Sequence, residues 1–329
     1  MLVDGKWSDA WRPVQSTDAK GGFVRQVSSF RNWVTPDGAA GATGEGGFRA
    51  EAGRYHVYAA LGCPWATRVL IARKLKRLEG VISVALVEPI MTDEGWRFGG
   101  APGANRDDLN GATYLHELYT LADPHYTGRA TVPVLWDRER RTMVNNESAD
   151  ILRMFNTAFA AFTEPSVDLY PMDLRAEIDA LNGEVYSSLN NGVYRAGFAT
   201  TQIAYDEAFI GVFAMLDVLE KKLAAGPYLF GGRLTEADVR VFVTLARFDA
   251  AYHGVFKCNF RRIADYPNLS AYLARLIAIP AFRDTFNLDQ IKRGYYSIKA
   301  LNPTRIVPLG PELPWASEPA DALFDPRAG

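Results

Sequence analysis

The sequence has few cysteines and no long hydrophobic run, and each absence excludes a class of protein. Only Cys63 and Cys258 occur among the 329 residues, so a disulfide framework is excluded. No apolar stretch approaches the length of a membrane span. The first residues lack the apolar core of a signal peptide. Together these features predict a protein of the reducing cytoplasm.

An excess of charge of one sign is also missing. The formal net charge is −2, so the chain has no basic field to recruit nucleic acid or an anionic membrane. The two cysteines and four histidines show no paired ligand spacing, so we expect no metal site. No Walker-type or dinucleotide-type glycine motif is present. What remains is an ordinary globular composition, 48% apolar and 22% charged, in a chain long enough for two domains.

Residues 51–160 predict an α/β thioredoxin-like domain. The pattern is strand, helix, strand, a long insertion at 89–128 without clear secondary structure, then a hairpin and a helix that starts near Glu147. A strand, helix and strand of this length form a parallel βαβ unit. Pro133 lies where a central strand would exclude it, and a cis Val132–Pro133 bond resolves the conflict. The expected ranges are strands at 54–60, 81–88, 131–137 and 142–145, with the first helix at 65–79.

The rest of the chain predicts an extended N-terminal arm, a helical domain and a C-terminal tail. Residues 1–50 lack sustained periodicity and are expected to form an extended N-terminal arm. Residues 166–300 carry helical spacing, and Thr235 with Asp238 forms a capping box before a buried helix. Residues 301–329 are rich in proline and are expected to be a tail.

Cys63 is the strongest candidate for chemistry. It lies at the predicted turn between the first strand and the first helix, and Pro64 suits the first helical position. The N–H groups of Trp65 and Ala66 would then point toward the sulfur, and the helix dipole would favour a thiolate. An activated nucleophile is therefore expected, with a buried structural cysteine as the alternative.

Local motifs carry a family resemblance over nearly the whole chain. The motifs are Leu-Gly-Cys-Pro-Trp-Ala at 61–66, Gly-Trp at 95–96, Thr-Val-Pro-Val-Leu-Trp-Asp at 131–137, Asn-Glu-Ser at 146–148, Asn-Asn-Gly-Val-Tyr-Arg-Ala-Gly at 190–197 and Arg-Phe-Asp-Ala-Ala-Tyr at 247–252. With these motifs the chain resembles the xi class of glutathione transferases, the glutathionyl-hydroquinone reductases. The resemblance implies the glutathione transferase fold, an α/β thioredoxin-like N-terminal domain followed by an all-α C-terminal domain.

The resemblance implies glutathione as the co-substrate and a set of residues that hold it. Glu147 and Ser148 would bind the γ-glutamyl end, and Val132 would pair with the cysteinyl backbone as an added strand. Trp96 and Arg129 match the residues that hold the glycyl end. The alternative role of Glu147 and Ser148 is to cap a helix. The alternative for Arg129 is that it is a solvated charge on a loop.

The resemblance also singles out tyrosines, which would line a hydroquinone pocket. Tyr194 and Tyr252 are the expected catalytic phenols, and Tyr295 is the further pocket residue, although Tyr296 beside it is not excluded. Tyr295 and Tyr296 are expected to lie beyond the last clear helix. With 15 tyrosines in the chain, packing is the alternative role for each.

The expected activity is glutathione-dependent reduction of S-glutathionyl-hydroquinones through a Cys63–glutathione mixed disulfide. No second cysteine lies near Cys63, so external glutathione must resolve the intermediate, and Cys258 is expected to be structural. The alternatives are an omega- or beta-like thioltransferase and a non-catalytic transferase-like interaction module. Ordinary conjugation is disfavoured because a cysteine would trap glutathione as a disulfide. The family also implies a homodimer formed through the helical domain.

Overall fold

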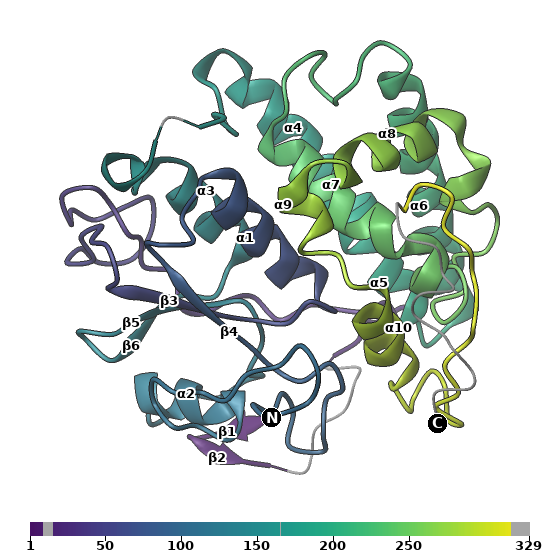
Figure 1. The fold of residues 1–329 in the computed structure, drawn as a ribbon. Coiled ribbons are helices and arrows are strands. Elements are labelled where there is room, and N and C mark those ends of the chain that lie inside the picture. The colour runs from purple at the N-terminus through teal and green to yellow at the C-terminus, as the bar shows by residue number, and fades with distance from the viewer. Residues whose placement is uncertain (9–15, 165, 317–329) are drawn as a thin grey trace. The chain divides into compact units, whose positions relative to one another are not determined.

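The computed structural model describes residues 1–8, 16–164 and 166–316 (Figure 1). The chain forms two compact units. Unit 1 contains the described residues of Met1–Arg12 and Gln26–Leu169, and unit 2 those of Pro13–Arg25 and Tyr170–Gly329. Parts of the expected arm and tail, residues 9–15 and 317–329, lie outside the described residues.

Unit 1 is built on a four-stranded sheet in the order β4-β3-β5-β6. Strand β3 pairs in parallel with β4, with Val57 opposite Val84, and antiparallel with β5, with Val57 opposite Leu135. The hairpin of β5 and β6 and the parallel βαβ unit are thereby confirmed. The strands span Tyr55–Ala59 (β3), Ser83–Leu86 (β4), Val134–Asp137 (β5) and Thr142–Asn145 (β6).

Helices α1 (Pro64–Leu75) and α3 (Ser148–Thr157) lie on one side of this sheet, and α2 (Leu115–Ala122) on the other (Figure 1). Every side chain of β3 is buried, as a strand covered on both faces requires. A hairpin of β1 (Leu2–Val3) and β2 (Lys6–Trp7) joins the unit where Leu2 pairs with Gly128.

Helix α2 corrects the expectation that residues 89–128 have no clear secondary structure. Tyr114 and Glu117 form a capping box at its start, and Leu115, Leu118 and Tyr119 are its buried positions. A helix of eight residues offers too few apolar positions for its period to stand out in a polar segment.

Unit 2 is helical, and α7 is its most buried helix. All twelve residues of α7 are buried, and the predicted capping box of Thr235 and Asp238 is confirmed at its start. Short 3-10 turns occur at Ala160–Phe162 in unit 1, and at Met172–Leu174 and Ile263–Asp265 in unit 2. The α-helices of unit 2 are α4 (Arg175–Val185), α5 (Gly192–Gly197), α6 (Gln202–Leu223), α7 (Glu236–Arg247), α8 (Pro267–Ile277), α9 (Pro280–Arg283) and α10 (Leu288–Tyr296).

Two π-helical segments interrupt this unit, η3 at Tyr186–Asn190 and η4 at Phe248–Tyr252. Such segments are rare and occur most often at functional sites. Tyr252 is the last residue of η4, and Tyr194 follows η3 by four residues. Tyr295 and Tyr296 belong to α10, which corrects the expectation that they lie beyond the last helix.

Candidate active site

Cys63 occupies the N-cap position of α1, and Pro64 is the first helical residue, as predicted. The backbone of Cys63 is extended, with φ −83° and ψ 121°. Its N–H donates to the carbonyl of Ala60 (3.1 Å), and its carbonyl accepts from the N–H of Thr67 (3.0 Å). Strand β3, the turn and helix α1 therefore fix the position of the sulfur.

One contact of the sulfur is with the turn that contains Pro133. Sγ of Cys63 lies 3.7 Å from the carbonyl oxygen of Val132, toward which the thiol donates. Among the described residues, no helix N–H makes a capping hydrogen bond to this side chain. The Val132–Pro133 bond is cis, as predicted, and Val132 is buried. The cysteine and the cis-proline turn are thus neighbours in unit 1.

Glu147 and Ser148 begin helix α3. Glu147 is the N-cap residue, and its carboxylate accepts hydrogen bonds from the N–H of Ala149 (3.1 Å) and the hydroxyl of Ser28 (3.0 Å). Ser148 is buried at the first helical position. Glu147 therefore caps the helix, as its alternative role predicts. Glu147 and Ser148 also lie at a helix N-terminus, and such a terminus favours a carboxylate ligand.

Arg68 is a residue that the sequence analysis missed. It lies on α1, is 2% exposed, and its guanidinium is 4.5 Å from the centre of the Trp65 ring. Its Nη1 is 3.5 Å from Oγ of Ser148. A buried charge needs partners, so Arg68 links the helix that carries Cys63 to the helix that carries Ser148. An arginine inside an otherwise apolar run is the sequence signal that marks it.

Trp96 and Arg129 lie near the two ends of the insertion. The carbonyl of Trp96 accepts from the N–H of Leu115, at the start of α2 (2.9 Å). The N–H of Arg129 donates to the side chain of Gln26 (3.0 Å), and its carbonyl accepts from the hydroxyl of Tyr126 (3.1 Å). These contacts hold the two backbones, and the binding role of both side chains stays a prediction.

Unit 2 brings the three predicted tyrosines together. The hydroxyl of Tyr295 lies 2.6 Å from that of Tyr194 and 2.8 Å from that of Tyr252, so the phenols form a chain with Tyr295 in the middle. The rings of Tyr252 and Tyr295 meet edge to face at 5.2 Å. Tyr295, rather than Tyr296, therefore belongs to the cluster, and Tyr194 is its half-exposed member.

Burial sets the protonation state of this phenol chain. It raises the pKa of Tyr252 and that of Tyr295 well above the usual value, because a phenolate would lose its hydration. Arg247, itself buried, opposes both shifts. Tyr252 and Tyr295 are therefore neutral at physiological pH, and their hydrogen-bonded hydroxyls can relay a proton toward Tyr194.

Cys258 behaves as a structural residue. It is fully buried in unit 2, and burial raises the pKa of its thiol to about 12. Such a thiol carries almost no thiolate at neutral pH, which makes it a poor nucleophile. It is therefore unsuited to resolve a disulfide on Cys63.

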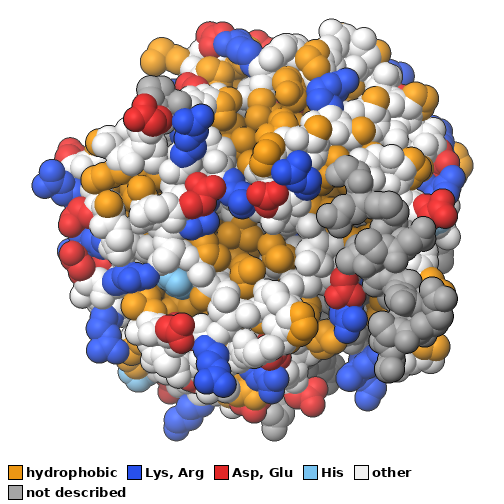
Figure 2. Space-filling model, in the orientation of Figure 1, with side chains coloured by type: hydrophobic (Ala, Val, Ile, Leu, Met, Phe, Trp, Pro, Cys, Tyr) orange, Lys and Arg blue, Asp and Glu red, His pale blue; other side chains and the backbone are white. Residues whose placement is uncertain are grey.

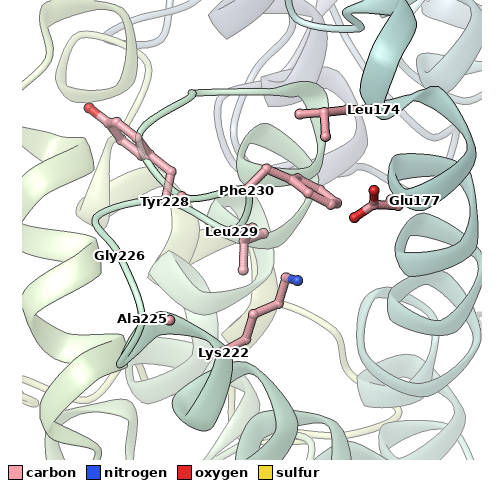
Figure 3. A pocket seen from close by; sticks show the side chains of 9 residues that line it. Leu174, Glu177, Lys222, Ala225, Gly226, Tyr228, Leu229 and Phe230 are labelled. Atoms are coloured by element: carbon pink, nitrogen blue, oxygen red, sulfur yellow. The ribbon is translucent and has the colours of Figure 1, made fainter.

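A pocket of about 290 Å³ opens elsewhere in unit 2, between α4 and the loop after α6 (Figure 3). Glu177 and the ring of Phe230 point toward it, and Lys222 lies below that ring (Figure 3). No predicted site residue lines it. On the face of the molecule in Figure 2, acidic and basic side chains are interspersed, in keeping with the small net charge.

Comparison with known families agrees with this fold. The family described as glutathione S-transferase, N-terminal domain, matches residues 62–158. The family described as glutathione S-transferase, C-terminal domain, matches residues 202–275. The chain belongs to the glutathione transferase family.

Individual relatives place it more narrowly. Glutathionyl-hydroquinone reductase YqjG of Escherichia coli is 52% identical, covering 94% of this chain and 95% of the relative. Glutathionyl-hydroquinone reductase PcpF of Sphingobium chlorophenolicum is 50% identical, covering 95% of this chain and 97% of the relative. The likeness extends over nearly the full length, so the chain is a member of the xi class, and the expected resemblance is confirmed.

Solved structures give the same result. The glutathione-bound structure of YqjG from Escherichia coli superimposes with a TM-score of 0.88 at 49% identity, covering 98% of this chain and 99% of that one. The glutathione S-transferase Xi of Phanerochaete chrysosporium gives a TM-score of 0.86 at 50% identity, covering 91% of this chain and 96% of that one. The predicted fold class is therefore confirmed. In the described part of the chain, no helix is long and apolar enough to cross a membrane.

Proposed function

We propose that this protein reduces S-glutathionyl-hydroquinones to hydroquinones, with glutathione as co-substrate. The observation that carries the proposal is the hydrogen-bonded chain of Tyr194, Tyr295 and Tyr252, because a thioltransferase acting on disulfides needs no such proton source. Two glutathionyl-hydroquinone reductases at 52% and 50% identity support it. The glutathione-bound structure of a relative supports glutathione as the ligand.

The glutathionyl part of the substrate binds in unit 1. Glu147 and Ser148 hold its γ-glutamyl end, where the carboxylate of Glu147 attracts the ammonium and the start of α3 attracts the carboxylate. The backbone of Val132 pairs with the cysteinyl residue, which brings the substrate sulfur to Cys63. Trp96 and Arg129 hold the glycyl end. Support comes from the contact between Cys63 and Val132 and from the burial of Ser148.

The first chemical step breaks the bond between sulfur and the aromatic carbon. The thiolate of Cys63 attacks the sulfur of the thioether, and a disulfide forms between Cys63 and glutathione. The electron pair of the broken bond stays with the ring carbon, which takes a proton from Tyr194. Tyr252 and Tyr295 stabilise charge on the ring oxygen through the phenol chain. The ring is thereby reduced as two sulfur atoms are oxidised to a disulfide.

The second step restores the enzyme. A second glutathione loses its thiol proton, which replaces the proton that Tyr194 gave to the ring. The resulting thiolate attacks the glutathionyl sulfur, oxidised glutathione leaves, and Cys63 becomes a thiolate again. Glutathione must act here because the thiol of Cys258 is buried and remains protonated.

The test is to follow the release of free hydroquinone from an S-glutathionyl-hydroquinone by chromatography. We expect Cys63→Ser to abolish turnover and Tyr194→Phe to lower it by roughly a hundredfold or more. The matched control is Cys258→Ser, which should keep the wild-type rate once folded. Full activity in Cys63→Ser would overturn the proposal. Rapid reduction of a glutathione mixed disulfide, with no reaction of the thioether, would favour an omega- or beta-like thioltransferase instead.

We also propose a homodimer formed through the helical unit, working in the cytoplasm. Ile203 and Ile210, one heptad apart on α6, are 66% and 67% exposed, a surface that a second copy would cover. Reduced glutathione, which the second step consumes, is abundant in the cytoplasm. Sedimentation should give twice the chain mass for the wild type and the chain mass for Ile210→Glu. A monomeric wild type would contradict the proposed dimer and would leave the proposed activity untouched.

A further inference from the structure

Residues 16–25 form a loop that belongs to unit 2, although in sequence they lie between the two parts of unit 1. Thr17 pairs with Phe23 across an antiparallel bridge, and the N–H of Gly22 donates to the carboxylate of Asp18 (2.8 Å). Glycine is required at position 21, where φ is +83° and a Cβ would lie 2.6 Å from Oγ1 of Thr200. The loop therefore has one defined shape.

Two further contacts fasten this loop to the segment that follows the helix of Tyr194. The N–H of Thr200, between α5 and α6, donates to the carbonyl of Gly21 (3.0 Å). The ring of Phe23, which is buried, lies 5.5 Å from the ring of Phe198. The loop thus packs against the segment that follows Tyr194 in the chain.

The loop ends by placing a cation against Tyr194. The guanidinium carbon of Arg25 lies 4.6 Å from the centre of the Tyr194 ring. Nε of the same side chain donates to Oδ1 of Asn191 (2.8 Å), and Asn191 is the N-cap residue of the helix that contains Tyr194. One arginine therefore fixes both the start of α5 and the face of this ring.

A cation over an aromatic ring attracts the electron density of that ring. The attraction is stronger when the phenol has given up its proton, because the negative charge of a phenolate spreads into the ring. The guanidinium of Arg25 therefore stabilises the phenolate of Tyr194 more than its neutral phenol. An interaction that strengthens as the proton is transferred lowers the barrier and raises kcat. Tyr295, whose hydroxyl touches that of Tyr194, supports the oxygen from the other end of the ring.

We propose that Arg25 is a positioning residue for Tyr194, and that the loop at 16–25 exists to hold its guanidinium on the ring. The inference rests on the proposed function, because it assigns Arg25 a role only if Tyr194 acts as the proton donor. It gives the N-terminal arm a part in the reaction, which its sequence did not suggest.

The test compares Arg25→Met, which removes the charge, with Arg25→Lys, which keeps it. Lys20→Met is the matched control, since Lys20 lies in the same loop and forms an exposed ion pair with Glu207. Each variant is assayed for kcat and KM on an S-glutathionyl-hydroquinone and on the mixed disulfide of glutathione and mercaptoethanol. The second substrate needs Cys63 but no proton on a ring carbon.

We expect Arg25→Met to lower kcat on the thioether by roughly 5- to 30-fold, with KM and the disulfide reaction unchanged. Arg25→Lys should keep most of the activity, and Lys20→Met all of it. An equal loss on both substrates, or an equal loss in Arg25→Met and Arg25→Lys, would overturn the inference, because each outcome indicates a purely structural role.

Tyr194→Phe, alone and combined with Arg25→Met, separates this inference from the proposed function. Adding Arg25→Met to Tyr194→Phe should cost no further activity, because the cation acts through the phenol. If Tyr194→Phe is impaired while Arg25→Met is not, the inference fails and the proposed function stands. If Tyr194→Phe keeps full activity, the proposed role of Tyr194 fails and the inference fails with it.

Discussion

At the scale of single residues, the proposed chemistry divides between a sulfur in unit 1 and three phenols in unit 2. Cys63 lies at a helix start beside a cis-proline turn, which is the arrangement that offers a sulfur to an extended peptide. The three phenols are hydrogen-bonded to one another, and two of them, Tyr252 and Tyr295, are buried. In the proposed reaction the sulfur takes glutathione from the substrate and the phenols supply the proton.

Tyr295 and Tyr296 provide a matched pair for testing the phenol chain. Tyr295 holds the hydroxyls of both Tyr194 and Tyr252, whereas Tyr296 lies outside the cluster. Tyr295→Phe should lower kcat on the thioether by about tenfold or more, because both hydrogen bonds are lost. Steady-state kinetics should give Tyr296→Phe a near wild-type rate. Equal effects in the two variants would contradict the central role of Tyr295.

The role of a single residue could be predicted from the sequence where it depends on residues that neighbour it in the chain. Cys63, Pro64 and the cis bond before Pro133 follow from neighbouring residues, and the structure has all three as predicted. The contacts of Arg25 and Arg68 could not be found that way, although its position in an apolar run marks Arg68 in the sequence. Their partners lie far along the chain, and only tertiary packing brings an arginine to a tyrosine ring or to a buried serine.

At the scale of elements, the positions of the helices were predictable where the apolar period is long. The buried helix α7 and its capping box follow directly from the sequence. Helix α2 is too short to show a period, and α10 has few buried positions in its nine residues, so neither was found. The π segments η3 and η4 leave no pattern in composition, although they set the direction of the helices around Tyr194 and Tyr252.

Asp238 shows how much one cap contributes to unit 2. Its carboxylate accepts hydrogen bonds from the N–H groups of Leu229 and Thr235 and from the hydroxyl of Tyr272, at 2.8 to 3.0 Å. Burial raises the pKa of Asp238, and these hydrogen bonds oppose the rise. The buried acceptor therefore holds the start of α7 to its surroundings.

We expect Asp238→Asn to lower the free energy of unfolding by about 2–4 kcal/mol, because an amide turns one acceptor into a donor facing other donors. Urea unfolding followed by far-ultraviolet circular dichroism measures the change. The exposed Asp108→Asn is the charge-matched control and should shift the free energy by less than about 0.5 kcal/mol. A stability of Asp238→Asn equal to that of this control would refute the capping account.

At the scale of the whole molecule, stability should depend on pH through His56. This residue is buried in β3, and burial lowers its pKa to about 4. Its Nδ1 lies 2.7 Å from the hydroxyl of Ser83, and its buried Nε2 has no hydrogen-bond partner among the described residues. Between pH 6.5 and about 4, the unfolded chain binds a proton that the folded chain excludes. Folding is therefore weakened as the pH falls through that window.

From this shift we expect His56 to remove about 2 kcal/mol of stability between pH 7 and pH 5. Urea unfolding at the two pH values, followed by tryptophan fluorescence, should show a smaller pH difference for His56→Gln than for the wild type. His125→Gln is the control, because His125 is exposed and Asp4 raises its pKa. An unchanged pH difference in His56→Gln would show that other groups control acid stability.

The central claim is that Cys63 removes glutathione from an aromatic carbon and holds it as a mixed disulfide. The most direct test is a single turnover, with enzyme in excess over an S-glutathionyl-hydroquinone and no free glutathione present. We predict one hydroquinone released for each glutathione retained on the protein, with intact mass and peptide mapping locating the adduct on Cys63. Hydroquinone released without an adduct, or an adduct on Cys258, would contradict the account.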